Sequence, residues 1–221
     1  MPSDLIELPI FPLTGTVLLP GCFLPLNIFE PRYLNMVADA LDGGGLIGMV
    51  QPVVPAADNW GPVPDQLMEP EVYAVGGAGQ IKQHEPQPDG RSLILLEGRT
   101  RFSIVDELEP RNGYRRARVD PSLFPEDHSQ PPDLEVSRLL RAAERLRDEH
   151  GLDLDLDLLA GLPATSLLNG LCSALPVAPA EKQALLEAPT AAERLELLLD
   201  VLGMTFEVSS SESRHEPPLV N

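Results

Sequence analysis

Two apolar, proline-rich stretches near the start of the chain decide its fold. They are Leu8-Pro9-Ile10-Phe11-Pro12-Leu13 and Leu19-Pro20-Gly21-Cys22-Phe23-Leu24-Pro25-Leu26-Asn27-Ile28-Phe29-Glu30-Pro31-Arg32-Tyr33. Both belong to a run of 22 uncharged residues between Glu7 and Glu30, which is long enough to span a bilayer. Its prolines and glycines recur about every four residues and would break a helix. No basic segment precedes the run, so it is not a signal peptide, and it predicts short buried strands joined by turns.

Strand patterns continue from there to about residue 120. Pro31 occupies the position of a first helical residue, and Tyr33, Leu34, Val37 and Leu41 follow at helical spacing. The remaining apolar runs of this half predict strands, and Pro88-Asp89-Gly90 predicts a turn between two of them. These runs are Leu5–Leu13, Thr16–Leu19, Leu46–Val50, Val72–Val75, Gly79–Lys82, Leu93–Leu96 and Tyr114–Val119.

Helical patterns replace strand patterns after Pro121–Pro132, a segment that contains four prolines. Asp133 is the expected cap of a helix that ends at Gly151. Two shorter helices are expected at Pro163–Leu175 and Pro179–Ala188. Thr190-Ala191-Ala192-Glu193 is a capping box that opens a last helix, which should end near Leu202 with Gly203 after it.

The composition restricts the possible partners. With 34 acidic and 16 basic residues the chain carries a net charge of −18. Nucleic-acid affinity comes largely from Lys and Arg that neutralise phosphates, so a DNA duplex is a poor partner. The two cysteines, Cys22 and Cys172, lie in apolar stretches and predict free thiols in a reducing compartment, the cytoplasm.

No catalytic constellation can be assembled from these residues. There is no Gly-Lys-Ser/Thr after a glycine-rich loop, and therefore no Walker A motif, and Gly-x-Ser-x-Gly is also absent. A Ser–Lys dyad would have to use Lys82 or Lys182. Lys182 is expected in the first turn of an exposed helix, where burial would not lower its pKa. The sequence therefore predicts neither ATP hydrolysis nor peptidase activity.

Metal and cofactor sites are not predicted either. Asp153, Asp155 and Asp157 resemble the start of a calcium loop, but Leu158 and Ala164 stand where that loop needs Gly and a carboxylate. Alternating Leu and Asp at a helix start explains the pattern better. The four histidines are scattered and form no zinc motif with the two cysteines. We expect no metal and no cofactor.

Two features could bind a partner. The first is a group of arginines, of which Arg99, Arg101, Arg116 and Arg118 are candidate anion-binding residues. The full group also contains Arg111 and Arg115, and the alternative is a solvated face paired with Glu97, Asp106, Glu107 and Glu109. The second feature is the loop Pro52–Pro70, whose five prolines flank Trp60, Leu67 and Met68. These three apolar residues either contact a peptide or fold back as a lid on the core.

The opening stretches and two later segments resemble the N-terminal (substrate-binding) domain of Lon proteases. The later segments are Gly76–Ile81 and Leu95-Leu96-Glu97-Gly98-Arg99-Thr100-Arg101-Phe102, and the helical part is also similar, at Leu168-Asn169 and at Pro179-Ala180-Glu181-Lys182-Gln183. The resemblance covers about residues 5–204. The motif residues it marks are expected to be structural: Pro12, Pro20, Gly21, Pro25, Phe29, Glu30, Arg32, Tyr33, Glu97, Gly98 and Arg101.

The resemblance implies an α+β fold, a PUA-like β-barrel followed by a small C-terminal helical bundle. The barrel would take residues 1–120, a linker 121–132, the bundle 133–206 and a flexible tail 207–221. The ATPase and protease domains of the family have no counterpart in this sequence, so we expect a stand-alone bacterial member.

The expected function is a non-catalytic polypeptide-binding module that recognises exposed or unfolded protein segments, as an adaptor or chaperone-like factor. The alternative is a small-molecule or RNA-binding protein that uses the barrel. DNA and membranes are not expected partners.

Overall fold

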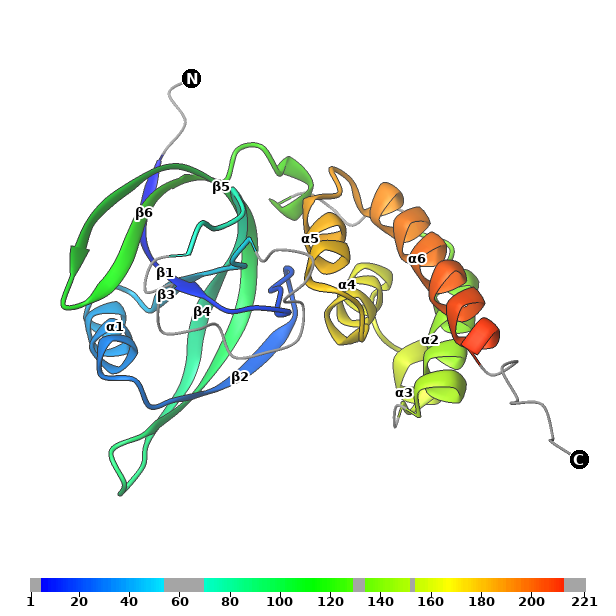
Figure 1. Cartoon of the computed structure of the whole chain (residues 1–221), viewed down its shortest axis with the longest axis horizontal. Coiled ribbons are helices and arrows are strands. Elements are labelled where there is room, and N and C mark those ends of the chain that lie inside the picture. Colours follow the sequence, from blue (N-terminus) through cyan, green and yellow to red (C-terminus); the bar gives the residue numbers. More distant parts are fainter. Residues whose placement is uncertain (1–4, 54–69, 129–133, 152–153, 213–221) are drawn as a thin grey trace, which may run out of the picture.

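Figure 1 shows the computed structural model, which describes residues 5–53, 70–128, 134–151 and 154–212. The strands of the first half are β1 Ile6–Pro12, β2 Phe23–Ile28, β3 Leu46–Val50, β4 Val75–Pro86, β5 Ser92–Arg111 and β6 Tyr114–Asp120. β3 has the bounds that the sequence predicted. The predicted turn at Pro88-Asp89-Gly90 joins β4 to β5, and Gly90 has the positive φ of 86° that such a turn requires.

Five of the strands close into a ring. β1 pairs in parallel with β3 and antiparallel with β6, while β3–β4, β4–β5 and β5–β6 are antiparallel pairs. β5 is long enough to pair with β2 along its first half and with β6 along its second half. β2 therefore lies outside the ring, at the edge of the sheet. Buried apolar side chains fill the ring, among them Ile10, Val50, Phe102 and Ala117.

The predicted helix at Pro31 forms as α1 (Pro31–Asp42), with proline in its first turn. Its buried face packs Tyr33, Met36 and Val37 against side chains of the sheet. Leu41, which the spacing assigned to that face, is instead exposed. The helix thus covers one side of the sheet and forms a second core next to that of the ring.

The second half is helical and packs beside the barrel (Figure 1). Its elements are the 3-10 helix η2 Pro125–His128 and the α-helices α2 Val136–His150, α3 Leu156–Ala160, α4 Ala164–Ala174, α5 Pro179–Glu187 and α6 Ala191–Glu212. The predicted α+β class, with strands first and helices after them, is confirmed.

Three predicted helix ends can be compared with the structure. The cap of α2 is Glu135, two residues after the expected Asp133, which lies outside the described residues. Gly151 ends α2 in the left-handed conformation as predicted, with φ 64°. The expected end of the last helix near Leu202 is wrong, because Gly203 does not adopt a positive φ and α6 continues to Glu212. The rest of the predicted tail, residues 213–221, lies outside the described residues.

The predicted strand at Thr16–Leu19 is wrong, although its apolar residues are buried. This segment is a loop that crosses the sheet, with Leu18 and Leu19 almost fully inaccessible. A Cβ at Gly77 would collide with the carbonyl of Leu18, and one at Gly98 with the carbonyl of Leu19. The glycines of β4 and β5 therefore let backbone pass over backbone at close range.

The same loop connects the barrel to the bundle. Val17 and Leu19 belong to the apolar core of the helices and not to that of the ring. A buried polar contact reinforces the junction, since Gln51 donates from Nε2 to the Pro179 carbonyl and to Gln183 Oε1, both at 3.1 Å. Gln183 in turn donates to the carbonyl of Val75 in β4. The two halves thus share apolar and polar contacts.

Candidate functional site

All six arginines of the predicted basic group have a carboxylate partner. The pairs are Arg99–Glu97, Arg101–Asp127, Arg111–Asp39, Arg115–Glu107, Arg116–Glu7 and Arg118–Asp106. Three of these carboxylates, Glu97, Asp106 and Glu107, are those that the paired-face alternative named. Asp39 and Glu7 come from α1 and β1, which spacing alone could not place. The arginines do not form an unneutralised patch.

Arg101 is not available to a surface anion, because its side chain is only 1% exposed. The guanidinium of this residue donates to Asp127 of η2 at 2.9 Å, to the carbonyl of Leu186 within α5 and to the carbonyl of Ala188 just after it. It also lies over the ring of Phe124, 4.3 Å from the ring centre. A surface anion cannot reach this guanidinium, which instead ties β5 to the helices.

Most of the other family-motif residues also have structural contacts. The carbonyl of Pro20 accepts from Asn169 of α4, and Gly21 has a positive φ of 77°. Glu30 pairs with Arg32, whose guanidinium lies over the ring of Tyr33. Glu97 and Gly98 belong to β5, and Pro12 ends β1.

Phe29 departs from this expectation. It follows one residue after β2 and is 65% exposed, so it contributes little to the core. Phe23, at the start of β2, is 60% exposed, and Leu93 on the paired strand is 42% exposed. The sequence did not identify Phe23 and Leu93 as surface residues, because the uncharged run and the apolar run Leu93–Leu96 both predicted buried strands. The alternation along β2 could have found Phe23, since Phe23, Pro25 and Asn27 share one face.

A proline interrupts the row of backbone hydrogen-bonding groups at the free edge of β2. Gly98 N–H donates to the Cys22 carbonyl, so the even-numbered residues of β2 exchange backbone hydrogen bonds with β5. The backbone groups of Phe23, Pro25 and Asn27 therefore point away from the sheet. Proline has no N–H, so Pro25 interrupts this edge and blocks the addition of a regular strand. The exposed apolar side chains on and beside β2 are those of Phe23, Pro25, Phe29 and Leu93, and Asn27 adds an amide; we call the four apolar residues the β2 face.

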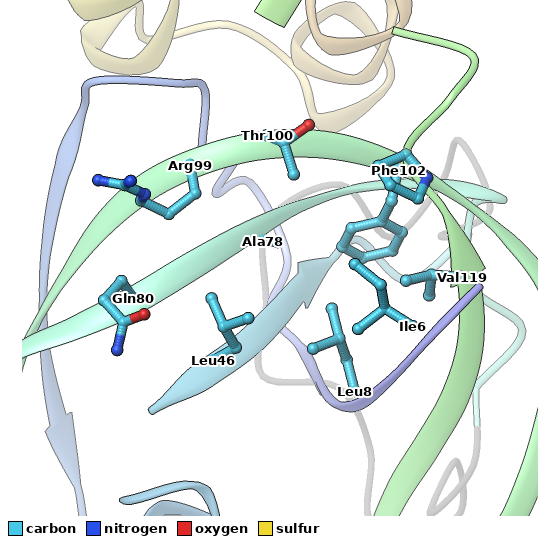
Figure 2. A pocket seen from close by; sticks show the side chains of 10 residues that line it. Ile6, Leu8, Leu46, Ala78, Gln80, Arg99, Thr100, Phe102 and Val119 are labelled. Carbon is cyan, nitrogen blue, oxygen red and sulfur yellow. The ribbon is translucent and has the colours of Figure 1, made fainter. Parts of the chain in front are cut away.

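A pocket of about 190 Å³ opens at one end of the barrel (Figure 2). Four of its lining residues are buried in the barrel core, and Gln80, Arg99 and Thr100 add polar groups. The apolar lining residues are Ile6, Leu8, Leu46, Ala78, Phe102, Val119 and Pro121. Arg99, one of the predicted anion-binding residues, lies at the margin of this pocket.

The prediction that Lys182 is exposed is wrong. It is half-buried, its Nζ donates to the Ser173 carbonyl at 2.8 Å, and burial lowers its pKa. The hydroxyl of Ser173 bonds to the Cys22 sulfur at 3.6 Å. This lysine therefore binds a backbone oxygen in place of the serine hydroxyl that a Ser–Lys dyad requires.

The two cysteines are free, as expected. Burial raises the pKa of the Cys172 thiol to about 12 and also raises the pKa of Cys22. Both thiols stay protonated near neutral pH and are therefore poor nucleophiles.

The described ranges contain no group of three or more His, Cys, Asp or Glu side chains that could hold a metal ion. Asp155 caps α3 by accepting from the Leu158 N–H, which is the helix-start role predicted for it. None of the helices described is both long enough and apolar enough to cross a bilayer. Trp60, Leu67 and Met68 lie outside the described residues.

Comparison with known proteins assigns the fold to a family. Residues 7–203 match the ATP-dependent protease La (LON) substrate-binding domain. The chain belongs to the Lon substrate-binding domain family. Lon protease of Parabacteroides distasonis is 26% identical over 208 residues, which are 91% of this chain and 24% of that protein. Lon protease 2 of Desulfotalea psychrophila is 25% identical, over 93% of this chain and 26% of its own length. The chain thus spans about a quarter of these relatives.

A solved structure shows the same architecture. The Lon N-terminal domain protein from Xanthomonas campestris superposes with a TM-score of 0.61 and 26% identity, covering 88% of this chain and 98% of that one. This agreement places the barrel and the helices in one Lon-type N-terminal domain. The similarity to Lon proteases concerns this domain alone.

Proposed function

We propose that this chain is a non-catalytic, cytoplasmic polypeptide-binding module that captures exposed apolar segments of unfolded proteins, as an adaptor or chaperone-like factor. The observation that carries the proposal is the β2 face, on which Phe23 and Phe29 are each more than half exposed. Membership of the substrate-binding domain family supports the same conclusion. No nucleophile–base pair among the described residues competes with it.

The β2 face suits an unfolded client because it binds side chains. Aromatic side chains contribute a large apolar area, and Leu93 extends this area onto β5. Pro25 prevents a client from extending the sheet through a continuous backbone ladder. Binding would then depend on apolar content and little on sequence, which a factor with many clients requires.

The acidic charge of the molecule complements this role. A net charge of −18 keeps neighbouring copies apart, so an exposed aromatic face does not cause self-association. The same charge disfavours RNA, the alternative partner, and all six arginines of the basic group are paired. No observation on the structure favours RNA over a polypeptide.

The test is the affinity for a permanently unfolded protein, such as a reduced and carboxymethylated one, measured by fluorescence anisotropy. Burying two partly exposed Phe side chains contributes about 2 kcal/mol. The double variant Phe23→Ser/Phe29→Ser should therefore bind at least about tenfold more weakly. Leu158 on α3 is 66% exposed, which makes Leu158→Ser the matched control, and this variant should bind normally.

Salt provides the second measurement. Apolar capture should change little between 50 and 200 mM salt, whereas RNA binding would weaken steeply over the same range. If the double variant binds the unfolded protein as tightly as the unaltered chain does, the β2 face is not the client site. If affinity for RNA exceeds that for the unfolded protein, the proposed function is wrong.

A further inference from the structure

The pocket at the end of the barrel shares none of its lining residues with the β2 face. Four of its lining residues, Leu8, Ala78, Phe102 and Val119, are buried in the barrel core. Ile6 and Leu46 are less buried. Figure 2 shows the apolar side chains around the hollow, with Arg99 and Gln80 together at one side. The pocket therefore has an apolar interior and a polar margin that carries a cation.

Its volume limits the ligand. Pockets for drug-sized molecules measure about 300–1,000 Å³. The 190 Å³ found here is therefore too small to enclose a nucleotide. A cavity of about 150 Å³ lined by Leu, Ile and Phe is enough to bind benzene. The occupant should accordingly be one ring or one branched aliphatic group, the size of a phenylalanine or leucine side chain.

The charged side chains at the margin of the pocket indicate which charge the bound molecule carries. Glu97 is shared by two cations, with Lys82 Nζ at 3.1 Å and Arg99 at 3.2 Å. Two positive charges on one carboxylate leave a surplus of +1 beside the pocket, in a chain of net charge −18. The side chain of Arg99 is 56% exposed and forms one hydrogen bond to Glu97, which leaves further N–H groups to donate.

We propose that this pocket binds an apolar group attached to a carboxylate, with the apolar part between Leu46 and Phe102 and the carboxylate on Arg99. Two kinds of molecule have this chemistry. One is the free C-terminus of a polypeptide that ends in Leu or Phe. The other is a small branched carboxylic acid such as 4-methylpentanoate. In both, a charge-assisted hydrogen bond to Arg99 would fix the orientation of the buried group.

Calorimetric titration of the full chain tests the proposal with three probes. These are an acetylated tetrapeptide ending in leucine, the same peptide as its C-terminal amide, and 4-methylpentanoate. The free acid should bind about tenfold more tightly than the amide, since the amide removes the charge-assisted bond. Binding of 4-methylpentanoate as tight as that of the peptide would indicate a small-acid site, and binding of the peptide alone a polypeptide terminus.

Variants locate the site. Arg99→Gln should weaken the free acid about tenfold and leave the amide unchanged. Arg118→Gln removes the same charge from another surface ion pair outside the pocket and should change neither. Leu46→Phe should fill the hollow and weaken all three probes. In the unaltered chain, methyl resonances of Ile6 and Leu46 should shift on titration, which tests the location even if a variant fails to fold.

Several results would overturn the proposal: equal affinity for acid and amide, normal acid binding by Arg99→Gln, or methyl shifts confined to other residues. None of them affects the proposed function, because capture of an unfolded protein through Phe23 and Phe29 does not involve this pocket. Conversely, loss of that capture would leave the pocket's affinity for 4-methylpentanoate unchanged.

Discussion

Arg101 shows how one buried charge can join two parts of a molecule. Its guanidinium has an ionic partner, Asp127, which is itself only 4% exposed, and it also donates to backbone carbonyls at the end of α5. Removing one member of a buried pair leaves the other charge without compensation, which costs about 3–5 kcal/mol. Since whole domains are stable by about 5–15 kcal/mol, this contact decides whether the junction holds.

We therefore expect Arg101→Met to lower the free energy of unfolding by about 3–5 kcal/mol in urea denaturation. Arg118→Met is the control, since its pair with Asp106 lies at the surface and should contribute less than about 1 kcal/mol. The double variant Arg101→Met/Asp127→Leu should recover part of the loss, because no unpaired charge remains. A change of less than 1 kcal/mol in Arg101→Met would show that the buried pair is not important for stability.

Gly77 and Gly170 allow a matched test of close backbone approach. Gly77→Ala should destabilise the protein by about 1–3 kcal/mol or more, because its Cβ would force the Leu18 carbonyl away. Gly170 lies inside α4 with open space around it, so Gly170→Ala should stabilise by about 0.5–1 kcal/mol. Thermal unfolding of both variants separates the two effects. Equal shifts would mean that the loop adapts freely and that β4 does not need this glycine.

At the scale of elements, the sequence correctly predicted the features that neighbouring residues determine. Proline at the first helical position gave the start of α1, and Pro88-Asp89-Gly90 gave the turn between β4 and β5. The prediction of a strand at Thr16–Leu19 failed because the conformation of this segment depends on distant residues. Its apolar residues look the same in a buried strand and in a buried loop, and the difference lies in glycines of other strands.

The candidate site was less predictable than the fold. From its charge alone, Arg101 is expected at the surface. The partners that bury it come from η2 and the end of α5, which are far away in the sequence. The exposed face of β2 was not predicted, because an uncharged run is expected to be buried along its whole length. Alternation within a strand at the sheet edge decides exposure there, and the edge position depends on tertiary pairing.

The loop Pro52–Pro70 stays a predicted client-binding element. Its five prolines reduce the entropy lost on ordering, so Trp60, Leu67 and Met68 can be presented at low conformational cost. As the sole tryptophan, Trp60 should emit near the water-like limit and be quenched by iodide. Its emission should shift to the blue when an unfolded client is added. Blue, unquenched emission without client would instead identify the loop as a lid on the core.

At the scale of the whole molecule, the barrel and the bundle share buried contacts, and we expect them to unfold as one cooperative unit. Val17 and Leu19 are contributed by the β-rich half but are buried among the helices. Gln51 makes hydrogen bonds across the same junction, and Arg101 has its ionic partner Asp127 beyond β6. A chain that lacks the helices therefore loses apolar burial, polar partners and charge compensation together.

Truncation after Val119 tests this cooperativity. The shortened chain should expose Val17 and Leu19 to water and lacks the Asp127 carboxylate and the α5 carbonyls that Arg101 binds, so it should aggregate or melt at a much lower temperature. Size-exclusion chromatography and thermal denaturation provide the measurements. Adding Val17→Ser and Leu19→Ser to the truncated chain should improve its solubility, because both changes remove apolar side chains that only the helices cover. A truncated chain that stays monomeric with an unchanged melting temperature would show that the barrel is an independent domain.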